Sequence, residues 1–253
     1  MSDISVILDP QNPGQFYACC GLLELCEQMN PGSVASFKDD AMTSRTAVFR
    51  VKTPGQLSLD ECIEALRKAD VTVLPHKDPK TSPVRMVGPR YDITLSWWLK
   101  WAQQDTTPLK LWAGQQCGKD ILLDMVRSQP DGPAISDALF YFSVPLKGRF
   151  GIDPRAAWLP QDCGFSPNEL DLEVLTYPAV ELLGAIGLQT NLILPPRARE
   201  GIPYFLWNED LPAITARAAS MGALKELPGH HFRFLLISRG SYKAFDFAKE
   251  ERK

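Results

Sequence analysis

The sequence has 253 residues, 45% of them hydrophobic and 23% charged, which is enough for one large domain or two modest ones with a real core. This composition excludes an intrinsically disordered chain. The net charge is −3 and the isoelectric point is about 5.7, so the chain lacks the basic excess of a freestanding nucleic-acid-binding protein. Any contact with nucleic acid must therefore be local, or shared with a more basic partner.

The lack of a recognisable targeting signal and the spacing of the cysteines indicate a reducing compartment. The first residues, Met1 to Ser5, lack the basic and long apolar regions of a signal peptide, and no apolar run approaches the length of a bilayer span. We therefore expect a cytoplasmic protein without membrane contact. The cysteines form no Cys-x-x-Cys pair, so we expect buried thiols and neither a metal ion nor a cofactor; they are Cys19, Cys20, Cys26, Cys62, Cys117 and Cys163.

The segment after Asn12 predicts a buried helix that continues to Met29. Asn12 is a favourable N-cap, Pro13 fits the first helical position, and Gln15 can close a capping box. The eight residues after Gln15 carry no charge, and a helix that is apolar on all sides belongs inside a protein. This helix marks a structural centre and contains no reaction centre.

The elements around this helix alternate between strand and helix up to residue 74. The segment 30–32 ends the first helix, and Ser58 caps the next one; the other expected elements are the strand Ile4–Leu8, the strand Thr46–Val51, the helix Leu57–Ala69 and the strand Val71–Leu74. This β-α-β-α-β order suggests an α+β layer. The next segment, 76–90, contains three prolines, a glycine and four basic residues against one acid, so we predict a mobile or functional loop there.

The second half continues the α+β pattern without a clear linker. After a strand at Tyr91–Leu95 we expect a helix that carries Trp97, Trp98 and Trp101. Further expected elements are a helix from Lys110 to Ser128, a break at 129–133, a strand at Leu139–Val144, an irregular segment at 147–167, a second apolar helix at Tyr177–Gln189, a strand at Gly201–Trp207, a helix at Leu211–Met221, and a hairpin of Phe232–Ser238 with Tyr242–Phe247. The sequence thus predicts one α+β unit over residues 1–253, with a mixed or antiparallel sheet, packed helices, candidate ferredoxin-like elements and a candidate seam at 129–134.

Groups with known catalytic chemistry are few and lack a recognised arrangement. The chain shows no nucleophile elbow, phosphate-binding loop, dinucleotide fingerprint or zinc-protease motif. His230 and His231 are neighbours on an expected strand and point to opposite faces, which separates them as metal ligands. Asp153 near Arg155 could be a catalytic carboxylate, but a turn that orients the arginine is the better interpretation. We expect no enzymatic activity.

Two sets of residues could contact nucleic acid. The tryptophans at 97, 98, 101 and 112 could stack on bases, although aromatic residues at helical spacing more often fill a core. In the loop 76–90, prolines hold the backbone extended so that basic residues can follow a phosphate backbone; a solvated surface loop is the alternative. Our candidate nucleic-acid-binding residues are Lys77, Lys80, Arg85, Arg90, Arg149, Arg155, Arg239 and Lys243.

Several blocks of the sequence carry a family resemblance through their common order and spacing. They extend from residue 12 to about residue 250, nearly the whole chain, and are Asn12–Gln15, Ala18–Leu25, Ser96–Leu99, Lys110–Gln115, Phe150–Trp158, Tyr177–Leu183, Ile186–Gln189 and Arg239–Phe247. Together they resemble the small or accessory subunits of subtype I-G (formerly I-U) CRISPR effector complexes. Each block is moderately specific, and the combination is more specific than any single block.

This resemblance implies a non-catalytic subunit of a guide-RNA-directed DNA surveillance complex in CRISPR antiviral defence. In such complexes base pairing reads the sequence, while the proteins hold backbones and sense the flanking motif. The implied partners are other CRISPR effector subunits, with guide RNA and target DNA reached through the complex. Two alternatives remain, namely a small metal-dependent nuclease using Asp153, Asp162 and Glu181, and a protein–protein adaptor without nucleic-acid contact.

Overall fold

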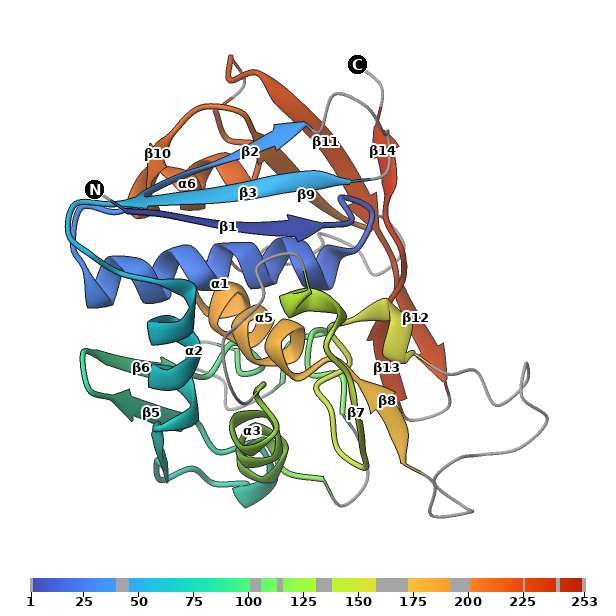
Figure 1. Ribbon diagram of the computed structural model, residues 1–253. Coiled ribbons are helices and arrows are strands. Elements are labelled where there is room, and N and C mark those ends of the chain that lie inside the picture. Colours follow the sequence, from blue (N-terminus) through green and yellow to red (C-terminus); the bar gives the residue numbers. More distant parts are fainter. Residues whose placement is uncertain are drawn as a thin grey trace.

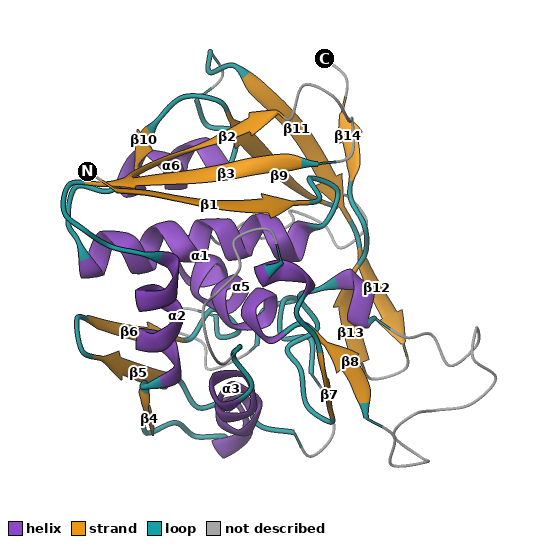
Figure 2. Ribbon diagram, viewed as in Figure 1, coloured by secondary structure: helices purple, strands orange, loops and turns teal. Residues whose placement is uncertain are grey.

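Helices occupy the middle of the protein, and strands lie above them and to both sides (Figure 1, Figure 2). The computed structural model describes residues 2–39, 46–100, 106–112, 116–130, 138–157, 173–191, 201–224, 226–239 and 242–251. The two central helices are α1 (Pro13–Met29) and α5 (Pro178–Thr190), and both ranges agree closely with the sequence prediction. The α+β class is confirmed, because helices pack against several antiparallel sheets.

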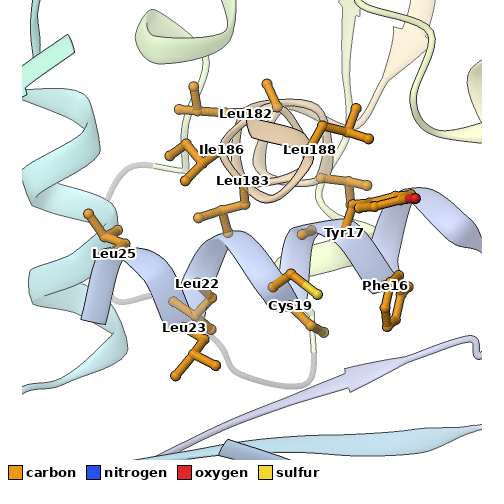
Figure 3. Packing of buried hydrophobic residues seen from close by; sticks show 14 of the residues in the cluster. Phe16, Tyr17, Cys19, Leu22, Leu23, Leu25, Leu182, Leu183, Ile186 and Leu188 are labelled. Carbon is orange, nitrogen blue, oxygen red and sulfur yellow. The ribbon is translucent and has the colours of Figure 1, made fainter. Parts of the chain in front are cut away.

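The helices α1 and α5 approach so closely that two glycines meet at their crossing. A Cβ atom added to Gly21 would lie 1.9 Å from the carbonyl oxygen of Leu183, and one added to Gly187 would lie 1.9 Å from that of Tyr17. A larger residue at either position would therefore overlap the opposing backbone. Figure 3 shows Leu183 of α5 directed toward α1, where both helices bury nearly all their side chains.

The start of α1 confirms the predicted cap but not the predicted capping box. The side chain of Asn12 accepts a hydrogen bond from the backbone N–H of Gln15 at 3.1 Å. The side-chain oxygen of Gln15, however, accepts from the backbone N–H of Asp9 at 2.6 Å instead of that of Asn12. Gln15 therefore ties the helix to the strand that precedes it.

One sheet covers a face of α1 (Figure 1). Its order is β1 (Ser2–Leu8), β3 (Ala47–Thr53), β2 (Val34–Asp39) and β10 (Leu211–Pro212), with β3 antiparallel to both β1 and β2. The strand β2 was not predicted from the sequence. The element order β1-α1-β2-β3-α2-β4 is that of a ferredoxin-like unit, but β4 joins a different sheet, so this four-stranded sheet is completed by β10 instead.

A second group of strands comes from the C-terminal part of the chain. The sheet β14 (Lys249–Glu251), β11 (Gly229–Phe234) and β9 (Ile202–Trp207) lies next to α6 (Ala213–Ser220). The predicted hairpin is confirmed in part, because β12 (Leu236–Arg239) pairs with β13 (Tyr242–Phe245). The residues Phe232 to Phe234, however, belong to β11, which pairs with β9 and β14.

A third sheet corrects the prediction that 76–90 is a loop. It has the order β4 (Asp70–Val73), β5 (Val84–Gly88) and β6 (Tyr91–Leu95), so the last third of that segment is mostly the middle strand of a sheet. Along β5, Val84 and Met86 are buried while Arg85 is exposed, which is the alternation of a strand. Flanking prolines obscured this pattern in the sequence. The capping box of α2 (Leu59–Arg67) is confirmed, with Ser58 as its N-cap.

The segment after β6 is not the helix that the sequence predicted. Trp97 and Trp98 lie in turns and pack with Trp112 and Phe150 in a cluster of edge-on and stacked rings. All four side chains are buried, which confirms the core role; Trp101 lies outside the described residues. The following helix, α3 (Gly118–Arg127), begins later than the predicted Lys110.

The remaining elements are short and surround the N-terminus of α5. They are η2 (Leu139–Tyr141), β7 (Val144–Leu146), η3 (Pro154–Ala156) and β8 (Val174–Thr176), so the predicted strand Leu139–Val144 is a 3-10 turn followed by a strand. A single cluster of buried apolar side chains extends from Ile4 to Ala248. The candidate seam at 129–134 lies mostly outside the described residues and stays a prediction.

Candidate nucleic-acid interface

The segment before β5 is held to the core through one tryptophan. The indole N–H of Trp98 donates a 2.7 Å hydrogen bond to the carbonyl oxygen of Thr81, which is buried at the end of η1 (Pro79–Thr81). The side chain of Asp78 caps this turn by accepting from the backbone N–H of Lys80 at 3.0 Å. The exposed side chains of Lys77 and Lys80 therefore extend from an anchored turn.

A second lysine lies on the segment that leads into the tryptophan cluster. The ammonium of Lys110 donates to the carbonyl oxygen of Trp112 at 2.9 Å and lies 5.3 Å from the centre of the Trp112 ring. Its side chain is half-buried. These contacts fix the position of the charge.

The strand β13 brings a third lysine to the same place. The backbone N–H of Lys243 donates to the carbonyl oxygen of Leu111 at 3.0 Å, next to Lys110 in the chain. The side chain of Lys243 is exposed. The hairpin therefore aligns with residues 110–112, although more than half of the sequence separates the two segments.

We call Lys80, Lys110 and Lys243 the lysine cluster. Partial burial lowers the pKa of Lys110; Asp78 offsets part of this effect, while the charges of Lys243 and Lys80 lower the pKa further. The charges of Lys80 and Lys243 thus act unfavourably on the ammonium of Lys110. A bound anion would relieve this repulsion, which is the electrostatic property that a phosphate-binding surface needs.

The arginines of the β5–β6 hairpin have a different environment from the lysine cluster. The Nε atom of Arg85 donates to the carboxylate of Asp92 at 2.8 Å, and Arg90 lies 3.9 Å from the carboxylate of Glu61. Arg90 also lines a surface groove of about 360 Å³ between α2 and the hairpin turn. The charges of both predicted arginines are therefore largely balanced by neighbouring acids.

The arginines near α5 lie close to buried carboxylates. Arg155 pairs with Asp153 at 2.6 Å, and its charge contributes to holding a turn. Arg149 is half-buried, and its positive charge favours the ionised form of Glu181 and so lowers the pKa of that carboxyl. The side chain of Arg239 lies outside the described residues. Of the predicted residues, the structure thus brings Lys80 and Lys243 together and leaves Lys77 on the same anchored turn.

Asp153 confirms the structural interpretation made from the sequence. Its carboxylate is fully buried and accepts from the backbone N–H of Arg155 at 2.9 Å, which forms the turn at the start of η3. It also accepts from the guanidinium of Arg155 and from the amide of Asn12 at 3.1 Å. The acid therefore links η3 to the first turn of α1.

Glu181 is enclosed by the backbone of the neighbouring loop. Its two carboxylate oxygens accept hydrogen bonds of 2.8 to 3.1 Å from the consecutive N–H groups of residues 150 to 153. Burial raises the pKa of Glu181 to about 7, although the N–H donors of Asp153 and Phe150 and the charge of Arg149 act in the opposite direction. Glu181 thus shapes this loop from inside the protein.

Most of the histidine and cysteine side chains that the structure describes are paired with other side chains or packed in the core. The Nδ1 atom of His230 lies 2.9 Å from a carboxylate oxygen of Glu250, whereas the ring centroid of His231 lies 4.5 Å from that of Phe205. The two histidines therefore face different partners, as predicted. Four cysteines are buried as predicted, Cys117 is partly exposed, and Cys163 lies outside the described residues. Within the described ranges, no group of three or more His, Cys, Asp or Glu side chains is placed to hold a metal ion.

Sequence reasoning missed Lys110 as a member of the site. Nothing in its local sequence distinguishes it from a surface lysine, because its neighbours Lys80 and Lys243 come from distant segments.

A comparison of the chain with protein-family models, curated proteins and solved structures finds no match. In the part of the chain that the structure describes, no helix has the length and apolar character to cross a membrane.

Proposed function

We propose that this protein is a non-catalytic subunit of a guide-RNA-directed DNA surveillance complex and contacts a nucleic-acid backbone through the lysine cluster. The observation that carries this proposal is the convergence of Lys80, Lys110 and Lys243 from three distant segments. Lysine is a compact, mobile donor to phosphate oxygens, and its contacts carry affinity rather than sequence preference. That suits a complex in which base pairing reads the sequence.

The acidic balance of the chain limits what the lysine cluster can do alone. A net charge of −3 gives phosphates no long-range attraction, so the isolated chain should bind weakly. Partner subunits would supply further cations and bring the backbone into position. The resemblance described above supports CRISPR effector subunits as those partners.

The alternative of a metal-dependent nuclease draws no support from Asp153 and Glu181. Both carboxylates are fully buried, and their oxygens already accept hydrogen bonds from backbone and side-chain N–H groups. Binding a metal would require these donors to be displaced. The third acid of that proposal, Asp162, lies outside the described residues. The adaptor alternative is tested by the experiment below.

The test compares two charge-matched double variants in nucleic-acid binding. The first is Lys80→Gln/Lys243→Gln, which weakens the lysine cluster; the control is Arg85→Gln/Arg90→Gln, which removes two cations balanced by acids. Fluorescence anisotropy with labelled single-stranded RNA, single-stranded DNA and duplex DNA is measured between about 20 and 200 mM salt, first with the chain and then with the assembled complex. The first variant should reduce the slope of log K against log salt by about two, and the control by less than one.

Three outcomes separate the hypotheses. Equal affinities and salt slopes for wild type and both variants, with assembly intact, would refute a role for the lysine cluster. Failure of the first variant to join partner subunits, with unchanged nucleic-acid binding, would favour the adaptor. Magnesium-dependent cleavage that Asp153→Asn abolishes would favour the nuclease.

A further inference from the structure

An arginine lies over two tyrosine rings near the N-terminus of α5. The Cζ atom of Arg155 lies 3.5 Å from the ring centroid of Tyr177 and 5.4 Å from that of Tyr141. The guanidinium is fixed because it pairs with Asp153 at 2.6 Å and donates to the carbonyl oxygen of Phe140, also at 2.6 Å. The two rings and the guanidinium, which we call the Tyr–Arg–Tyr stack, are therefore positioned before any ligand arrives.

The stack is covered at one end and open at the other. Tyr177 is half-buried and the side chain of Arg155 is 18% exposed, whereas Tyr141 is 48% exposed. The open end thus presents an aromatic ring on a backbone fixed by the η2 turn.

The chain connects this stack to the lysine cluster over a short distance. The backbone N–H of Phe245 donates to the carbonyl oxygen of Gly151 at 3.1 Å, and a Cβ atom on Gly151 would lie 3.1 Å from the carbonyl oxygen of Lys243. Four residues then lead from Gly151 to Arg155, a path that spans at most about 14 Å. A strand of a few nucleotides could therefore reach both places.

We propose that Tyr141 stacks on a base of a single-stranded nucleic acid whose phosphates contact the lysine cluster. The inference rests on the proposed function and adds the ligand class, because a base inside a duplex has both of its faces covered by neighbours. Stacking on an aromatic ring tolerates any base, which suits a strand of changing sequence. The guanidinium behind the ring adds a cation–π contact that holds Tyr141 in place.

The test uses the full-length chain and a single-stranded oligonucleotide that carries one 2-aminopurine, whose fluorescence is quenched by stacking. Tyr141→Leu removes the ring and Tyr141→Phe retains it. Phe247→Leu is the matched control, because Phe247 is 44% exposed and therefore similar to Tyr141, but none of the arginines that the structure describes lies over its ring. Anisotropy at low salt gives the affinity, and a salt series gives the phosphate contacts.

We expect Tyr141→Leu to lower the affinity about tenfold and to abolish the quenching, with an unchanged salt slope. Tyr141→Phe and Phe247→Leu should behave like wild type. Equal affinity and quenching in wild type and Tyr141→Leu would overturn the stacking proposal. If Lys80→Gln/Lys243→Gln still reduces the salt slope in that case, the proposed function survives; if wild type binds no nucleic acid, alone or assembled, both proposals are overturned.

Discussion

The crossing of α1 and α5 and the lysine cluster are both built from segments far apart in the sequence, but they tolerate change very differently. At the crossing, the backbones of Gly21 and Gly187 meet without room for one extra carbon atom. In the lysine cluster, the exposed side chains of Lys80 and Lys243 flank the half-buried Lys110, and their charges act unfavourably on it. The comparison teaches that the crossing determines whether the protein folds, whereas the lysine cluster can change without affecting the fold.

The largest effect should come from adding a methyl group at the crossing. Gly187→Ala places its Cβ 1.9 Å from the carbonyl oxygen of Tyr17, so the helices must separate and lose packing along their length. We expect a loss of at least about 3 kcal/mol in the free energy of unfolding, measured by urea titration. The control is Gly118→Ala at the start of α3, where the nearest atom would be 3.5 Å away and a gain of about 0.5 kcal/mol is expected. Similar losses at both positions would contradict the tight crossing.

Shortening a side chain at the same crossing should have the next largest effect. Leu183 is fully buried between the helices, so Leu183→Ala should cost about 2–5 kcal/mol of unfolding free energy. Ile214→Ala is the control, because Ile214 is 71% exposed on α6 and its truncation should change stability by less than about 0.5 kcal/mol. A loss below about 1 kcal/mol for Leu183→Ala would show that this packing is loose.

The buried carboxyl of Glu181 should make the core sensitive to pH. Burial raises its pKa in the folded protein to about 7 from an ordinary value of 4.5, so the folded state binds the proton more tightly. Stability is therefore fully present below about pH 4.5 and falls as pH rises toward 7, by about 3 kcal/mol.

Unfolding measured between pH 4 and 8 should show this decline in wild type and in the surface control Glu173→Gln. The decline should be absent in Glu181→Gln, whose amide also faces N–H donors and so lowers stability at every pH. A wild-type stability that rises over this range would mean that the N–H groups of residues 150 to 153 outweigh burial.

The smallest effect on stability should come from the lysine cluster. Lys80→Gln removes one of the charges that repel Lys110, so stability should stay within about 0.5 kcal/mol of wild type or rise slightly. The same change should weaken phosphate binding and lower the salt slope by about one. Thermal unfolding and anisotropy on one preparation test both expectations; a marked loss of stability would place Lys80 among the structural residues.

Local signals predicted the central helices well. The cap at Asn12, the prolines at the first helical positions and the unbroken apolar run located α1 and α5 to within a residue or two. The weaker predictions failed where two signals competed. The prolines around β5 hid a short alternating strand, and the aromatic spacing at Trp97 and Trp98 resembled a helix although the indoles pack edge to face from turns.

The candidate site was predictable only in part. Lys80 and Lys243 were expected from their basic or turn-rich surroundings, but Lys110 joins them only because Leu111 bonds to β13. Arg85 and Arg90 have comparable local sequence and yet lie beside Asp92 and Glu61. Local sequence cannot distinguish these cases, since the pairing of strands and the approach of distant segments decide which side chains each cation meets.

The central crossing also has a consequence for synthesis on the ribosome. The helix α1 emerges early, but its partner α5 follows only after the chain has passed Gly187, roughly ten to thirty seconds later at about 5–20 residues per second. During that interval β1, β2 and β3 can cover one face of α1, but the apolar face that packs on α5 has no native surface to cover it. We therefore expect nascent chains that end before Pro178 to be strong chaperone substrates and to aggregate when released.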